Sequence, residues 1–272
     1  MHLEVEGEPA GRKTVDGTPR AAPLATAIAM APVAALAAES ALAPELRAPT
    51  DLQLFLVLGL PNLPRRGKVE KIDRELHERV LLMNKGFGWT RSIDPDDWSE
   101  PELAHVELAA ALARMVVNGR PDVMVGLIPS AFGGSELADW MPGGALYKGA
   151  VERTRIAQKD GNLVGILWYQ GPTKEDPSKG PDYAKKFAAM IAQLRVDLRI
   201  KFVPVVVGEL KLGATGLALA TALNEVPQQV LPCFFVSSAG LRTDGDNTHL
   251  DSDRMWEFTE RFSRAWMDLA QP

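Results

Sequence analysis

The sequence predicts an α/β fold with a doubly wound parallel sheet that helices cover on both faces. Short, nearly continuous apolar runs recur along the chain, as is typical of parallel strands buried on both faces. Amphipathic segments with helical spacing lie between these runs, and signals for tight hairpins are few. Strand–helix–strand units of this kind are connected by right-handed crossovers, so we expect a three-layer sandwich.

Strands are predicted where a short apolar run is bounded by Pro, Gly or polar residues. The first run reads Leu-Gln-Leu-Phe-Leu-Val-Leu, and the second is ended by Pro129. The expected strands are Leu52–Leu58, Asp122–Ile128, Leu163–Trp168, Phe202–Val207 and Val230–Val236.

Helices are predicted between these strands. In Tyr183–Leu198 the apolar residues recur every three or four positions and form one stripe. Asn118-Gly119 and Asp160-Gly161 are typical of helix ends, since Gly and Asn tolerate the left-handed conformation found there. The expected helices are Pro101–Val117, Leu146–Lys159, Tyr183–Leu198, Thr215–Asn224 and Arg254–Leu269.

Composition limits the classes of function. The chain has 272 residues, 46% of them hydrophobic, which is enough for one large domain with a full core. Its net charge is −5 and it has no long basic block, so nucleic acid is not an expected partner. The single cysteine, Cys233, lies in an apolar run and is expected to be buried. One Cys and four His offer no zinc spacing, so no metal or other cofactor is expected.

The first 49 residues differ from the rest and are predicted to be a leader, with the folded domain at residues 50–272. Ala21–Ala43 is apolar and Ala-rich, and Ala35-Leu-Ala37 fits the small-residue pattern of a signal-peptide cleavage site. This predicts a secreted or periplasmic protein. The acidic front end is atypical of a signal, so the alternative is a disordered Ala/Pro-rich leader on a cytoplasmic protein. Pro32 and Glu39 interrupt the stretch, which argues against stable membrane insertion. The oligomeric state is left open.

Asp246 and His249 form a candidate acid–base pair in a loop near the C-terminus. A carboxylate three residues before a histidine can accept a hydrogen bond from the imidazole Nδ1–H. Nε2 is then free to act as a base toward a nucleophile from elsewhere in the chain. The alternative is a solvated turn rich in Asp, Asn and Gly.

Four loops should meet at one edge of the sheet, because ligands of open α/β sheets bind at the carboxyl ends of the strands. Glycines in such loops let backbone N–H groups approach a bound oxygen. Gly133, Gly134 and the Gln170 side chain could therefore converge on a developing oxyanion. For each loop taken separately, ordinary turn chemistry is the alternative. The loops are Gly59–Pro64, Pro129–Ser135, Tyr169–Pro172 and the segment that carries Asp246 and His249.

These loops resemble the motifs of the SGNH hydrolases, in the group of carbohydrate esterases that includes sialate O-acetylesterases and acetylxylan esterases. In that family the loops read Gly-Gln-Ser-Asn-Met, Ile-Pro-Cys-Ala-x-Gly-Gly-Ser, Trp-His-Gln-Gly-Glu and Asp-x-x-His. The corresponding stretches here are Gly59–Leu63, Ile128–Ser135, Trp168–Pro172 and Asp246–His249, and the resemblance runs from about Leu52 to Leu269. It implies a flavodoxin-like sheet and an acetyl ester of a glycan or small molecule as the partner.

The resemblance also assigns roles to single residues. Asp246 and His249 would be the catalytic acid and base, and Asn62, Gly134 and Gln170 would bind the ester or its oxyanion. The family's nucleophilic serine is replaced here by Pro61, which has neither a hydroxyl nor an N–H. The other departures are Leu60 for glutamine, Tyr169 for histidine and Pro172 for glutamate.

The sequence therefore predicts an acetylesterase-like hydrolase whose activity is very low or lost, and the alternative is an inert glycan-binding pseudoenzyme. Two rescues are conceivable. Ser130 or Ser135 could supply a hydroxyl from the second loop, or His249 could activate a water directly.

Four tryptophans could stack on sugar rings or pack in the core and its rim. They are Trp89, Trp98, Trp140 and Trp168.

Overall fold

The computed structural model describes residues 51–59, 77–91, 100–132, 135–170, 180–209, 216–241 and 252–270. By its internal contacts the chain divides into Met1–Leu42 and Ala43–Pro272, and every element given below belongs to the second part. The leader predicted at residues 1–49 lies outside the described residues, so the leader and the export of the chain stay predictions. In the described part of the chain, no helix combines the length and apolar character that a membrane span needs.

The core of the described chain is a seven-stranded sheet in the order β3-β2-β4-β1-β5-β6-β7. Every neighbouring pair is parallel except β2 and β3, which run antiparallel at one edge. β1 lies at the centre, between β4 and β5. The strands are β1 (Leu52–Gly59), β2 (Val80–Met83), β3 (Trp89–Thr90), β4 (Met124–Pro129), β5 (Gly161–Gln170), β6 (Val205–Glu209) and β7 (Cys233–Val236).

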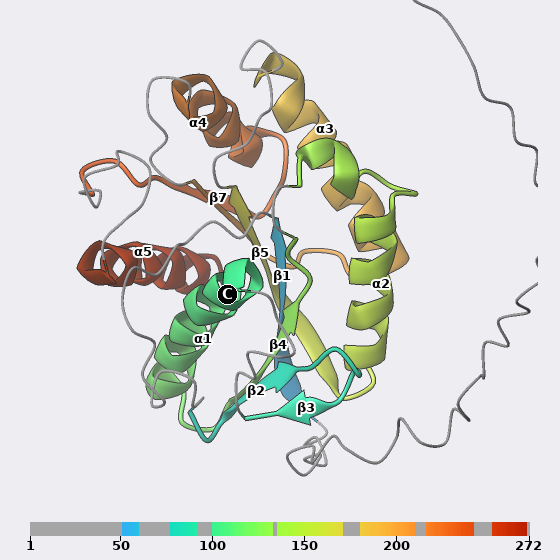
Figure 1. The fold of residues 1–272 in the computed structure, drawn as a ribbon, viewed down its shortest axis with the longest axis vertical. Helices are drawn as coiled ribbons and strands as arrows, with labels where there is room; N and C mark the ends of the chain where they lie inside the picture. Colours follow the sequence, from blue (N-terminus) through green and yellow to red (C-terminus); the bar gives the residue numbers. More distant parts are fainter. Residues whose placement is uncertain are drawn as a thin grey trace, which may run out of the picture. The chain divides into compact units, whose positions relative to one another are not determined.

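Helices cover both faces of this sheet, as the doubly wound prediction requires. The helices are α1 (Glu100–Gly119), α2 (Ala145–Ala157), α3 (Gly180–Asp197), α4 (Gly216–Glu225) and α5 (Ser252–Ala270), with short 3-10 turns at Leu137–Trp140 and Val226–Gln228. In Figure 1, α1 and α5 lie on one side of the sheet and α2 and α3 on the other. The side chains of α4 belong to the same core layer as those of α2 and α3.

Alternation along β1 shows why the sequence makes two core layers. Leu54 and Leu56 face the layer under α2, α3 and α4, whereas Phe55 and Val57 face the layer under α1 and α5. Successive side chains of a strand point to opposite faces, so a strand covered on both sides must be apolar throughout. The three-layer fold predicted from the sequence is confirmed.

The sequence prediction missed β2 and β3 and placed the starts of β4, β6 and β7 two or three residues too early. β2 has four residues and β3 two, which is too short for a periodic signal. β6 begins at Val205 rather than Phe202, because Phe202 is 79% exposed and Pro204 has no N–H to donate. β7 likewise begins at Cys233, after Pro232.

Candidate active site

Gly59 ends β1 at the centre of the carboxyl edge of the sheet. Its φ is +102°, and a Cβ at this position would lie 2.4 Å from the backbone oxygen of Tyr169 on β5. On the other side, the N–H of Phe132, just after β4, donates to the carbonyl of Gly59 at 3.0 Å. The ends of β4, β1 and β5 are therefore held side by side, and three of the four predicted loops begin at this edge.

Helix α5 leads back from the same edge. Near the end of β5, the ring of Tyr169 lies edge-on to that of Phe258, 5.7 Å away. Near the start of β5, Trp266 Nε1–H donates to the carbonyl of Val164 at 3.0 Å. The helix thus runs antiparallel to β5 and begins at Ser252 beyond the carboxyl end of the strand. The chain enters α5 at the edge where the other three loops begin, a few residues after His249.

Arg261 ties the chain after β7 to α5. Its guanidinium donates to the carbonyls of Ser237 and Ala239 at 2.9 and 3.0 Å and to the Glu257 carboxylate at 2.9 Å. Arg254 donates to the other oxygen of Glu257, also at 2.9 Å. Hydrogen bonds from Arg254 and then Arg261 lower the pKa of Glu257. The two flanks of the segment that carries Asp246 and His249 are therefore bonded to each other.

Most of the predicted site residues lie outside the described part of the chain. This holds for Pro61, Asn62, Gly133, Gly134, Asp246 and His249. The backbone of Gln170 is described and pairs with Glu209 at the end of β5, but its side chain is not. The roles and mutual distances of these residues stay predictions. The described strand and helix ends show only that the residues on either side of these loops lie close together.

The structure argues against replacing the nucleophile from the second loop. Ser135 is 5% exposed, and its Oγ–H donates to the carbonyl of Phe132 at 2.8 Å. The same oxygen accepts a hydrogen bond from Trp140 Nε1–H at 3.0 Å, so this hydroxyl has a structural role. Ser130 Oγ is buried and has no hydrogen-bond partner among the described residues. Neither hydroxyl is presented to a substrate.

The tryptophans, for which the sequence left both sugar stacking and core packing open, are core residues wherever they are described. Trp140 and Trp168 are each 1% exposed and meet edge to face at 5.9 Å, and Trp89 is 5% exposed. Trp98 lies outside the described residues. Tyr169 is also buried, against Phe258 and Phe262 of α5. The residue that replaces the family's histidine thus joins the apolar layer between sheet and helix.

One exposed aromatic residue lies at the carboxyl edge of the central strands, and the sequence analysis did not single it out. Phe132 is 51% exposed and lies three residues after the end of β4. Its position just before Gly133 in the second loop was the only signal available in the sequence.

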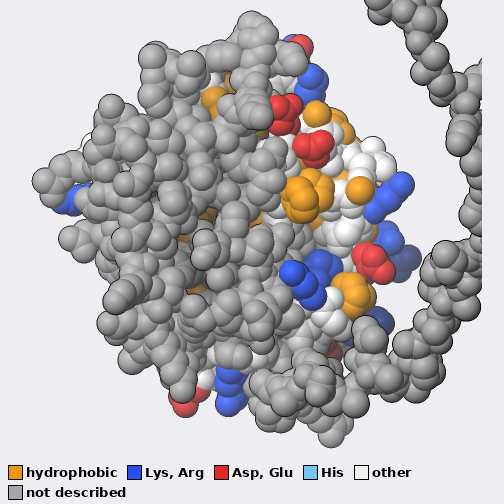
Figure 2. Space-filling view, in the orientation of Figure 1, with side chains coloured by type: hydrophobic (Ala, Val, Ile, Leu, Met, Phe, Trp, Pro, Cys, Tyr) orange, Lys and Arg blue, Asp and Glu red, His pale blue; other side chains and the backbone are white. Residues whose placement is uncertain are grey.

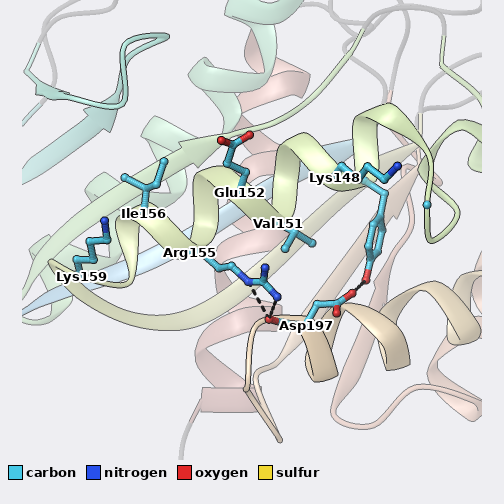
Figure 3. A pocket seen from close by; sticks show the side chains of 9 residues that line it. Lys148, Val151, Glu152, Arg155, Ile156, Lys159 and Asp197 are labelled. Carbon is cyan, nitrogen blue, oxygen red and sulfur yellow. Dashed lines mark hydrogen bonds between the residues drawn. The ribbon is translucent and has the colours of Figure 1, made fainter.

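A hollow of about 530 Å³ lies on the outer side of α2, against the end of α3 (Figure 3). There Tyr147 donates to the Asp197 carboxylate at 2.5 Å, and the Arg155 guanidinium donates to the Asp197 carbonyl. Charged side chains of both signs mix with hydrophobic ones over this part of the surface (Figure 2). The described residues that line it include no Ser, Cys or His, so they do not offer the nucleophile–histidine pair of a serine esterase. Its hydrogen bonds join the two helices.

Neither a metal cluster nor a reactive thiol is found in the described chain. No group of three or more His, Cys, Asp and Glu side chains is arranged there to hold a metal ion. Cys233 is 7% exposed, as predicted, and burial raises the pKa of its thiol to about 12. The expectation that the protein needs no cofactor stays a prediction.

The family assignment follows from comparison with known proteins. Residues 51–268 match the family described as carbohydrate esterase, sialic acid-specific acetylesterase. The chain belongs to this family. A probable carbohydrate esterase of Arabidopsis thaliana is 24% identical over 245 residues, which cover 82% of this chain and 94% of that protein. The resemblance to carbohydrate esterases stated from the four motifs is thereby confirmed.

Solved structures confirm the fold. The crystal structure of the Arabidopsis protein has a TM-score of 0.67 at 22% identity and covers 80% of this chain and 98% of that one. NanS has a TM-score of 0.58 at 18% identity, with 82% and 98% covered. A carbohydrate acetylesterase of Xanthomonas citri also reaches 0.58, at 17% identity, with 80% of this chain and 56% of that one covered.

Proposed function

We propose that this carbohydrate esterase relative binds an acetylated sugar at the carboxyl edge of its sheet and hydrolyses it very slowly or not at all. The observation that carries the proposal is Pro61, two residues after the end of β1, at the position of the family's nucleophilic serine. Proline supplies neither the attacking hydroxyl nor a backbone N–H for the oxyanion hole. A single substitution removes two parts of the catalytic apparatus.

The expected loss of activity is large. Removing the nucleophile from a serine hydrolase leaves roughly 10³–10⁴-fold acceleration over water, which comes from binding and the oxyanion hole. One lost oxyanion donor costs a further ~3 kcal/mol, or about 100-fold. Any hydrolysis that remains would use His249, oriented by Asp246, as a general base toward water.

The scaffold around the site supports retained binding. Gly59 keeps a conformation that excludes a side chain, and it is flanked by Tyr169 on β5 and by Phe132 in the loop after β4. Arg261 and Glu257 hold the entry to α5 beside the end of β7. These contacts hold together the strand ends at which the proposed sugar site would lie.

The direct test is an esterase assay on the purified chain with p-nitrophenyl acetate and an acetylated xylo-oligosaccharide. We expect very low turnover, no labelling by a serine-directed fluorophosphonate, and recovery of activity in the Pro61→Ser, Leu60→Gln double variant. Rapid turnover that the fluorophosphonate abolishes would refute the proposal. If the double variant stays inactive, Tyr169 and Pro172 must also have altered the site.

The His249→Ala variant separates residual hydrolysis from pure binding. If His249 activates water, the slow acetate release should fall to the uncatalysed rate in this variant. If the protein is instead an inert glycan-binding pseudoenzyme, His249→Ala should leave the background rate and the sugar affinity unchanged. Ser130→Ala is the matched control, because its buried Oγ has no part in either scheme.

A further inference from the structure

Among the described aromatic residues at the carboxyl edge of the central strands, Phe132 stands out because it is exposed there. Half of its surface is open to solvent, whereas Trp140, Trp168 and Tyr169 are each 1% exposed. Single exposed apolar residues are common on proteins, so exposure alone assigns no function. The position of Phe132 and the way its backbone is held add the necessary evidence.

The backbone of Phe132 is bonded on both sides. Its N–H donates to the carbonyl of Gly59 at 3.0 Å, which fixes it beside the residue that opens the nucleophile loop. Its carbonyl accepts a hydrogen bond from the Ser135 Oγ–H at 2.8 Å. The Ser135 Oγ in turn accepts a hydrogen bond from Trp140 Nε1–H. Because this backbone is already fixed, a ligand that binds the ring has only the two side-chain torsions of Phe132 to order.

The chemistry of the ring selects a sugar face. The face of an aromatic ring carries partial negative charge, and the C–H groups of a pyranose carry partial positive charge because oxygens withdraw electrons from them. A pyranose whose hydroxyls are all equatorial presents only C–H groups on each face. Such a ring can stack on Phe132 while its hydroxyls keep their hydrogen bonds to water.

We infer that Phe132 is the stacking platform for the pyranose ring that carries the acetyl ester. The inference rests on the proposed function, since it places that sugar at the same edge of the sheet. It takes over the role considered for the tryptophans, whose described members are buried. Stacking on Phe132 would also favour pyranoses with equatorial hydroxyls, such as those of xylan, over sugars that carry axial polar groups on both ring faces.

The test is saturation-transfer NMR and calorimetric titration of the full chain with acetylated xylotriose. In the wild type we expect the strongest transfer to the axial ring protons. Phe132→Ala and Phe132→Leu should each weaken binding about two- to tenfold, because Leu keeps apolar bulk but has no aromatic face. Phe132→Trp should bind at least as tightly as the wild type.

Phe202→Ala is the matched control. Phe202 is 79% exposed but lies before the amino end of β6, away from the carboxyl ends of the strands. Its loss should therefore leave the affinity unchanged. Wild-type binding that both Phe132→Ala and Phe132→Leu retain in full would overturn the inference and leave the proposed function standing. Absence of wild-type binding would overturn both. Circular dichroism of each variant checks that folding is intact.

Discussion

Replacing Gly59 by alanine tests whether the candidate site depends on a residue without a side chain. The positive φ of +102° disfavours alanine by about 1–2 kcal/mol. The new Cβ would also lie 2.4 Å from the Tyr169 oxygen, where ordinary contact begins at 3.4 Å, so about 3.4 − 2.4 = 1.0 Å must be absorbed by backbone. Loss of one adjoining hydrogen bond adds about 1 kcal/mol, for a total of about 2–3 kcal/mol.

Two other glycines separate the cost of the positive φ from the cost of the steric overlap. Gly143 has a φ of +93° but nothing within 4 Å of the point that a Cβ would occupy, so Gly143→Ala should cost only the conformational 1–2 kcal/mol, roughly. Gly149 lies within α2 with equally open space, and Gly149→Ala should stabilise the chain by about 1 kcal/mol. Urea unfolding followed by tryptophan fluorescence measures all three, provided that the m-value is unchanged. A Gly59→Ala loss no larger than that of Gly143→Ala would refute the reasoning.

Three further predictions concern the described surroundings. Ser135→Ala should cost about 1–3 kcal/mol in urea unfolding, because it leaves a buried indole N–H without its acceptor; an unchanged free energy of unfolding would contradict this. The Cys233 thiol should resist dithionitrobenzoate at pH 8 until the chain is unfolded. Because its pKa is raised to about 12, its contribution to stability is present below the ordinary thiol pKa and is lost as the pH rises toward 12; rapid native modification would show that the thiol is accessible. Tyr147→Phe should raise the pKa of Asp197 in an NMR titration, because the tyrosine hydrogen bond is the main cause that lowers it. The stability from this lowered pKa is present above the carboxyl's unfolded pKa and lost as the pH falls through the folded value, so the variant should lose less on acidification. An unchanged Asp197 pKa would exclude the hydrogen bond as the cause.

The sequence alone determined the layered fold and the family. Apolar runs such as Leu52–Leu58 bury all their side chains only when helices cover both faces of the strand. The spacing of Phe187, Met190 and Leu194 indicates a helix that packs on one side. The sequence also showed Pro61 at the position where the family motif has a serine. These features are local, because the period of burial and the identity of a motif residue can be read without knowing what lies nearby in space.

Only the tertiary structure decided which side chains are available. The sequence offered Ser130 and Ser135 as possible replacements for the missing hydroxyl, but the Oγ of Ser130 is buried, and Ser135 is both buried and bonded to Phe132 and Trp140. The sequence left the tryptophans open as sugar platforms or core residues; those described are core, whereas Phe132 is exposed. Exposure and hydrogen-bond partners depend on contacts between residues that are distant in the chain, such as Gly59 with Phe132 and Tyr169, and no local pattern encodes them.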